Sequence, residues 1–116
     1  MRLEHCALQV TDPLAMGEWY VKNLGCSVAR SSSAANPGLF LQAGMVLIEI
    51  YKDDKLPAPN YPSMPPSTLH LAFTSEHVKT DRDRLVHASA TTPVAYFAKP
   101  DVRHLAPLHA RLRTAR

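Results

Sequence analysis

The sequence predicts an α+β fold made of two similar strand–helix units, and three observations support this prediction. The chain has 116 residues, the size of one ordinary domain, and 46% of them are hydrophobic. Residues 1–51 show a strand–helix–strand–strand–strand order of hydrophobic spacing. Residues 52–66 contain five prolines, and a second strand–helix pattern follows in residues 67–98. We therefore expect a first unit, a stiff extended linker without a helix, and a partial second unit.

The first strand is predicted over residues 3–10, where apolar and other side chains alternate. Period two separates an apolar face from a face that carries polar groups. The apolar face holds Cys6, Leu8 and Val10, and the opposite face holds His5, Ala7 and Gln9. This alternation is typical of a strand that packs on a core with one face only.

A helix is predicted directly after this strand. Asp12 can accept hydrogen bonds from the free N–H groups of the first turn, and Pro13 suits the first helical position. Gly25 stands where a C-terminal glycine cap is expected. We expect Trp19 and Tyr20, which lie between these signals, to be core or interface residues.

Three further strands complete the first unit. They are predicted over residues 26–31, 39–42 and 45–51, with a loop over 31–38. In the second unit, a strand is predicted over residues 68–74, a helix capped by Ser75 follows, and a last strand is predicted over 93–97.

The two units show an internal repeat. An offset of 65 residues aligns His5 with His70 and Ala7 with Ala72, and each strand leads into a capped helix. Residues 99–116 break the pattern, because strand alternation does not continue and five Lys or Arg stand against one Asp. We expect a basic tail there without a strand.

Composition and charge exclude several classes of protein. The basic excess lies in the tail, and no basic stripe interleaved with aromatic residues runs through the body, which argues against nucleic-acid binding. No apolar run approaches 18 residues, so no membrane span is expected. Two cysteines without a disulfide framework, and an N-terminus without the apolar core of a signal peptide, indicate a cytoplasmic protein.

Three residues are candidates for chemistry because each is a ligand-type side chain in an apolar strand: His5, Glu49 and His70. A carboxylate in a central strand is costly to desolvate unless it is paired, hydrogen-bonded or bound to a metal ion. Two imidazoles and a carboxylate from adjacent strands could form an open metal site. The competing interpretation is that the histidines are hydrogen-bonded and the glutamate faces solvent.

The sequence resembles the vicinal oxygen chelate superfamily, which includes glyoxalases, bleomycin-resistance proteins and extradiol dioxygenases. The resemblance rests on residues 3–13, on Trp19-Tyr20 and on residues 23–26, and it extends over about residues 3–90. It implies paired βαβββ modules that form a cupped mixed sheet. The second module departs from the pattern and is expected to be truncated or remodelled. The tail is then either the product of a shifted reading frame or a variant end that contacts a partner chain.

The resemblance also implies a ligand set, one residue from the first and one from the last strand of each module. His5 and Glu49 match the first pair, and His70 matches the first ligand of the second. The offset of 65 places Thr114 at the fourth position, and we expect no ligand there. The implied cofactor is a divalent metal ion, Fe, Zn, Ni, Co or Mn.

Three functions are compatible with these residues. The first is a metal-dependent lyase or oxygenase that acts on a small oxygen-chelating substrate, with Glu49 also serving as a base. The second is a metal-free protein that sequesters a small apolar or aromatic molecule, as bleomycin-resistance proteins do, and the third is an inactive module. The residues expected to line the substrate site are Gln9, Phe40, Tyr51 and Thr74.

A homodimer is expected because an incomplete second module leaves a sheet edge exposed.

Overall fold

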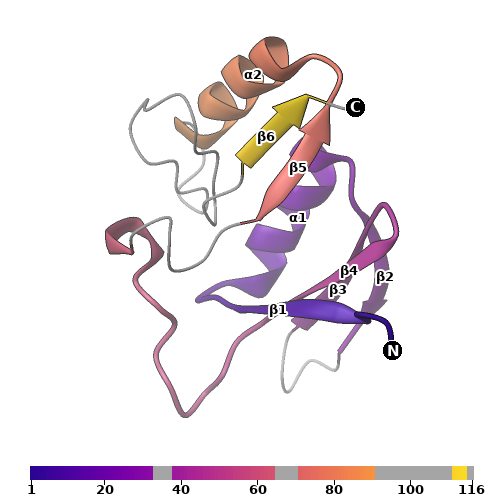
Figure 1. Ribbon diagram of the computed structural model, residues 1–116. Helices are drawn as coiled ribbons and strands as arrows, with labels where there is room; N and C mark the ends of the chain where they lie inside the picture. Colours follow the sequence, from indigo (N-terminus) through magenta and orange to yellow (C-terminus); the bar gives the residue numbers. More distant parts are fainter. Residues whose placement is uncertain (33–37, 65–70, 91–110, 115–116) are drawn as a thin grey trace. The chain divides into compact units, whose positions relative to one another are not determined.

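A computed structural model describes residues 1–32, 38–64, 71–90 and 111–114 (Figure 1). The chain divides into two compact units, residues 1–59 and 60–116. The first unit holds β1 (His5–Gln9), α1 (Pro13–Leu24), β2 (Ser27–Ser31), β3 (Gly38–Ala43) and β4 (Val46–Tyr51). The second unit holds the short 3-10 helix η1 (Tyr61–Ser63), β5 (Ala72–Ser75), α2 (Val78–Ala90) and β6 (Arg111–Thr114).

The first unit is a βαβββ module, which confirms the order predicted from the sequence. Its described strands form a mixed four-stranded sheet in the order β1-β4-β3-β2. β1 pairs in parallel with β4, and β3 pairs antiparallel with both β4 and β2. The parallel register places His5 opposite Leu47 and Ala7 opposite Glu49. The first and last strands of the module are therefore neighbours, although about forty residues separate them in the sequence.

Helix α1 begins and ends at the predicted signals. The Ala15 backbone N–H donates to Asp12 Oδ1 over 3.0 Å, Pro13 occupies the first turn, and Gly25 has φ of 68°. That positive φ suits glycine, because a side chain would be strained there. Each end of α1 therefore has a local cause in the sequence.

The core of the first unit lies between α1 and one face of the sheet. Helix α1 packs against β3 and β4. The core side chains that are at most 4% exposed are Leu8, Val10, Met16, Trp19, Tyr20, Leu41, Ile48 and Ile50. The predicted alternation in β1 is confirmed for Leu8 and Val10, whereas Cys6 is only partly buried. The other sheet face is left for polar and aromatic side chains.

In the second unit, the described strands β5 and β6 pair in parallel, and α2 packs against both. Ser75, the predicted helix cap, ends β5 and lies before α2: its Oγ accepts from the His77 backbone N–H over 2.9 Å, which forms a turn just ahead of the first helical residue, Val78. Leu85 of α2 is 2% exposed. The strand predicted over residues 93–97 lies outside the described residues, as does most of the loop predicted over 31–38.

Two expectations about the second half of the sequence were wrong. The proline-rich segment contains η1, and Tyr61 is 6% exposed, because prolines fit the first turn of a short 3-10 helix as well as an extended chain. The basic tail contains β6, which pairs with β5 over four residues. β6 is defined by its backbone pairing with β5, which the side-chain pattern of residues 99–116 does not indicate.

Among the residues that the structure describes, no helix is long and apolar enough to cross a membrane.

The burial of Leu41 predicts how much stability is lost when a cavity is made between α1 and the sheet. Leu41 is 0% exposed, so Leu41→Ala is expected to lower the free energy of unfolding by about 2–5 kcal/mol. Leu14→Ala is the matched control, because Leu14 is 54% exposed on α1, and it should change that free energy by less than about 0.5 kcal/mol. Urea denaturation measures both, and equal effects would contradict the packing described here.

Candidate functional site

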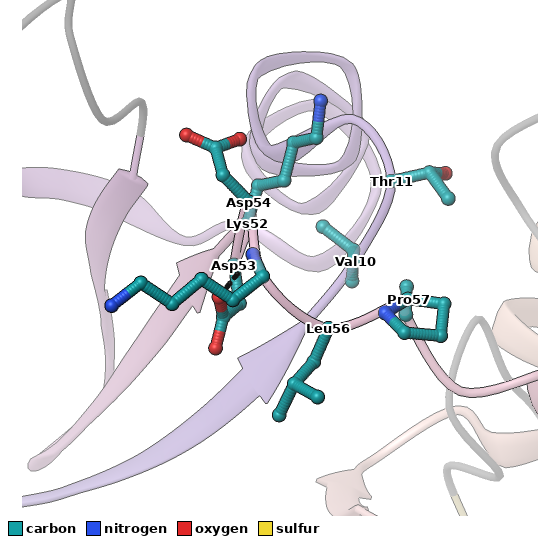
Figure 2. A pocket seen from close by; sticks show the side chains of 9 residues that line it. Val10, Thr11, Lys52, Asp53, Asp54, Leu56 and Pro57 are labelled. Atoms are coloured by element: carbon teal, nitrogen blue, oxygen red, sulfur yellow. Dashed lines mark hydrogen bonds between the residues drawn. The ribbon is translucent and has the colours of Figure 1, made fainter.

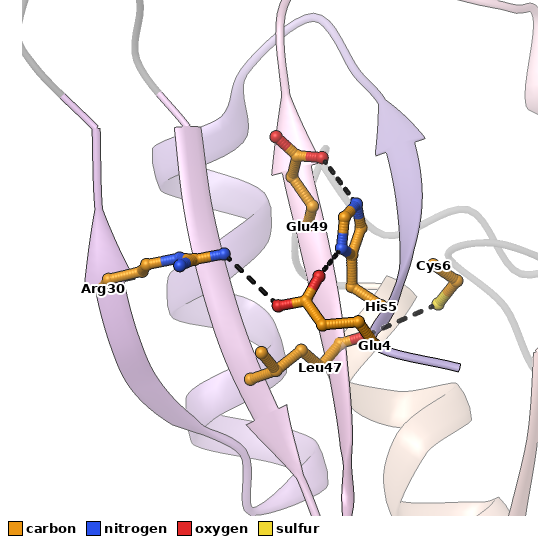
Figure 3. Close-up of polar contacts among 6 residues, drawn as sticks. All are labelled: Glu4, His5, Cys6, Arg30, Leu47 and Glu49. Carbon is orange, nitrogen blue, oxygen red and sulfur yellow. Dashed lines mark hydrogen bonds and ion pairs between the residues drawn. The ribbon is translucent and has the colours of Figure 1, made fainter. Parts of the chain in front are cut away.

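His5 and Glu49 lie side by side on the sheet face opposite α1. Figure 3 shows both side chains on the near side of the sheet, with the helix behind it. His5 Nε2 lies 3.4 Å from Glu49 Oε2, and the two side chains are 35% and 28% exposed. Parallel pairing of β1 with β4 brings the two residues together, and the pleat points them to the same face. The structure thus joins two of the three residues that the sequence predicts as ligands.

A second carboxylate holds the other side of the His5 ring. Glu4, just before β1, contacts His5 Nδ1 through Oε2, and its Oε1 lies 3.5 Å from Arg30 Nη2 (Figure 3). The hydrogen bond with His5 lowers the pKa of the Glu4 carboxyl below its usual value, and the charge of Arg30 lowers it further. Glu4 therefore stays ionised beside the imidazole at neutral pH.

An aromatic ring supports both basic side chains. The guanidinium carbon of Arg30 lies 3.8 Å from the centre of the Phe40 ring, in cation–π contact. The His5 ring meets the same ring edge-on, with centroids 5.4 Å apart and planes at 80°. Strands β1, β2 and β3 each contribute one of these three residues, so the pairing of the sheet organises the cluster.

The pair formed by His5 and Glu49 fits the donor chemistry of a metal site. Imidazole nitrogen and carboxylate oxygen are ordinary ligands of divalent transition metals, and two ligands of one ion lie roughly 3–3.5 Å apart. The separation of 3.4 Å lies in this range. Within residues 1–32, 38–64, 71–90 and 111–114, however, no three His, Cys, Asp or Glu side chains form a group that could hold an ion. Any complete site needs a further ligand.

The other predicted site residues have different outcomes. His70, the predicted third ligand, lies outside the described residues, and Thr74 is described only as a backbone position in β5. Gln9 and Tyr51 lie directly opposite each other in the β1–β4 pairing. Gln9 Nε2 donates to the Leu56 carbonyl over 2.7 Å, and Tyr51, like Phe40, is partly exposed. Phe40 lies opposite Glu49 in the β3–β4 pairing.

The cysteines do not suit a role as ligands. Burial raises the pKa of the thiols of Cys6 and Cys26 above the usual value, so both are protonated at neutral pH. Cys6 Sγ lies 3.8 Å from the Leu47 carbonyl oxygen, which it faces as a weak donor. Cys6 therefore behaves as a small structural residue.

The register of β5 with β6 changes which residue occupies the fourth ligand position. Ala7 lies opposite Glu49 in the first unit, whereas its repeat partner Ala72 lies opposite Arg111. The offset of 65 residues pointed to Thr114, which instead lies opposite Ser75. The position that corresponds to Glu49 by strand pairing is therefore held by an arginine, and this register supplies no fourth carboxylate.

Glu4 and Arg30 are not among the site residues predicted from the sequence. Neighbouring strand residues point to opposite faces, so a strand over residues 3–10 would direct Glu4 away from His5. The strand begins only at His5, and this leaves Glu4 outside the alternation. The signal that could have found it is a carboxylate directly before a ligand-type histidine. Arg30 carried no signal, because it stands on β2, which pairs with β3 and is separated from β1 in the sheet by β4 and β3.

A cavity of about 390 Å³ lies beside the end of β4 (Figure 2), and neither His5 nor Glu49 lines it. It is lined by Val10, Thr11 and residues 52–58. Asp53 Oδ1 accepts from the Lys55 backbone N–H over 2.8 Å, which forms a tight turn in this wall. Figure 2 shows the charged side chains of this segment pointing in different directions rather than converging on one point.

Solved structures resemble this chain in sequence and in fold. The protein SMU.1112c is 30% identical with a TM-score of 0.57, and the match covers 75% of this chain and 74% of that one. A glyoxalase family protein from Enterococcus faecalis is 29% identical with a TM-score of 0.56, covering 75% and 71%. No protein-family model and none of the curated proteins matches the sequence.

Two further solved structures share the fold at lower identity. The fosfomycin resistance protein FosX from Listeria monocytogenes is 17% identical with a TM-score of 0.66, and the match covers 99% of this chain and 91% of that one. TnmS3, an antibiotic binding protein from Streptomyces sp. CB03234, is 18% identical with a TM-score of 0.56, covering 98% and 95%. With the βαβββ order and the relatives near 30% identity, these matches show that the chain belongs to the vicinal oxygen chelate superfamily.

The contact between His5 and Glu4 predicts a measurable change in the Glu4 carboxyl. His5→Ala removes the largest cause of its lowered pKa, so this pKa should rise toward the usual value. Arg30→Gln should raise the same pKa by a smaller amount, because the charge of Arg30 is a lesser cause. Carboxyl carbon chemical shifts followed by NMR against pH give the values, and an unchanged pKa in His5→Ala would refute the contact.

Proposed function

We propose that this protein is a divalent-metal-dependent lyase or oxygenase that acts on a small oxygen-chelating substrate. The observation that supports this proposal is the pair of His5 and Glu49, with Nε2 and Oε2 3.4 Å apart on the face of the sheet that α1 leaves uncovered. His5 and Glu49 would supply two ligands. His70 is proposed as the third, on the strength of the repeat and the superfamily pattern.

The proposed metal site leaves coordination positions open for the substrate. A divalent ion held by three protein side chains would act as a Lewis acid on substrate oxygens. Glu49, at 28% exposure, is accessible enough to take a proton from a bound substrate and is proposed as the base. Gln9, Phe40 and Tyr51 are proposed to line the same face, and Thr74 stays a lining residue proposed from the sequence. The residue set suits Fe, Zn, Ni, Co or Mn without choosing among them.

The alternative is a metal-free protein that sequesters a small apolar or aromatic molecule. Two observations favour it: the described residues hold no group of three metal-binding side chains, and the similar protein TnmS3 binds an antibiotic. In this case the His5 ring, 3.4 Å from Glu49, would be a hydrogen-bonding group in the pocket, and Phe40 and Tyr51 would offer an aromatic surface to the ligand. The homodimer predicted from the sequence stays a prediction under both functions.

Metal content distinguishes the two functions. Protein purified without chelator is expected to contain about one transition metal ion per chain by elemental analysis. His5→Ala and Glu49→Gln should each weaken binding by more than about 100-fold, because each removes a ligand rather than a supporting group. His87→Ala and Glu18→Gln are the matched controls, since both residues are exposed on helices, and they should keep the metal.

A wild-type protein without metal, whose melting temperature does not rise when Fe²⁺, Zn²⁺, Ni²⁺, Co²⁺ or Mn²⁺ is added, would contradict the metal-dependent proposal. Screening of small aromatic ligands by the same thermal assay would then test the alternative.

A further inference from the structure

We propose that Glu4, held by Arg30, is a positioning residue that orients His5 for metal binding. This inference rests on the proposed function, because it assigns a role within the same site. Glu4 and Glu49 contact opposite nitrogens of one imidazole: Glu4 contacts Nδ1, and Glu49 lies near Nε2 (Figure 3). The two carboxylates therefore have different roles, and only Glu49 is placed to share an ion with His5.

The contact at Nδ1 selects one tautomer of the neutral ring. An ionised carboxylate only accepts hydrogen bonds, so a neutral His5 must carry its proton on Nδ1 to donate to Glu4. The lone pair is then left on Nε2, the nitrogen that faces Glu49. Ligating histidines commonly donate their second N–H to a carboxylate, which fixes the ring and raises its basicity as a ligand.

Without Glu4, the opposite tautomer would be favoured. A neutral ring could then carry its proton on Nε2 and donate it to Glu49, whose Oε2 is 3.4 Å away. That hydrogen bond would occupy both atoms that the proposed metal ion needs. Glu4 therefore decides whether His5 and Glu49 form a pair of ligands or a closed hydrogen-bonded pair.

Arg30 restrains Glu4 rather than the metal ion. Its Nη2 lies 3.5 Å from Glu4 Oε1, and its guanidinium is stacked on the Phe40 ring, against which the His5 ring also packs. The side chains of Glu4 and Arg30 are 61% and 57% exposed. Exposed ion pairs contribute little to stability, so their loss should affect orientation at the site more than folding.

Zinc titration of the metal-free protein tests the effect on binding. Glu4→Ala should raise the Zn²⁺ dissociation constant by roughly 10–100-fold, and Glu4→Gln, which keeps an acceptor oxygen, should raise it less. Arg30→Gln should have a smaller effect than Glu4→Ala. Glu18→Ala on α1 is the control and should leave the constant unchanged. Wild-type affinity in Glu4→Ala would overturn the proposal.

The tautomer of His5 provides a readout that does not need metal. Nitrogen chemical shifts of the metal-free protein, at a pH where the ring is neutral, should show the proton on Nδ1 in the wild type and in Glu4→Gln. In Glu4→Ala the proton should move toward Nε2. An Nε2–H tautomer in the wild type would overturn the role of Glu4. Absence of zinc binding by a wild type with the expected tautomer would instead refute the proposed metal function.

Discussion

The parallel pairing of β1 with β4 is the constraint on which the site depends. These strands are the first and last of the βαβββ module, and their register sets Ala7 opposite Glu49. His5 then lies two residues along β1 on the same face, within 3.4 Å of the carboxylate. A slip of one residue would turn Glu49 to the other face of the sheet, because side chains alternate along a strand.

The hydrophobic core keeps this register in place. Leu8 in β1 and Ile50 in β4 are paired directly, and both are almost fully buried beneath α1. A slip would expose these side chains and bury polar ones, which burial energetics oppose. The buried face thus determines which groups gather on the open face. Phe40 then supports His5 and Arg30, and Glu4 joins the two basic side chains.

Much of the first unit could be predicted from local signals. Asp12, Pro13 and Gly25 fix the ends of α1, and alternation in β1 and β4 separates the core from the site. The contact of Glu4 with His5 and the strand β6 could not be predicted this way. The contact of Glu4 arises because β1 begins at His5, two residues later than the predicted start at residue 3. β6 depends on backbone pairing with β5. In the register of this pairing, Arg111 rather than Thr114 holds the position of the second unit that corresponds to Glu49 of the first.

The central claim is that His5 and Glu49 share one metal ion. A crystal structure of the zinc-loaded protein, with anomalous data at the zinc edge, tests it most directly. The account predicts an anomalous peak between His5 Nε2 and Glu49 Oε2, roughly 2.0–2.2 Å from each atom. A zinc ion bound elsewhere, with His5 and Glu49 still in direct contact, would contradict it.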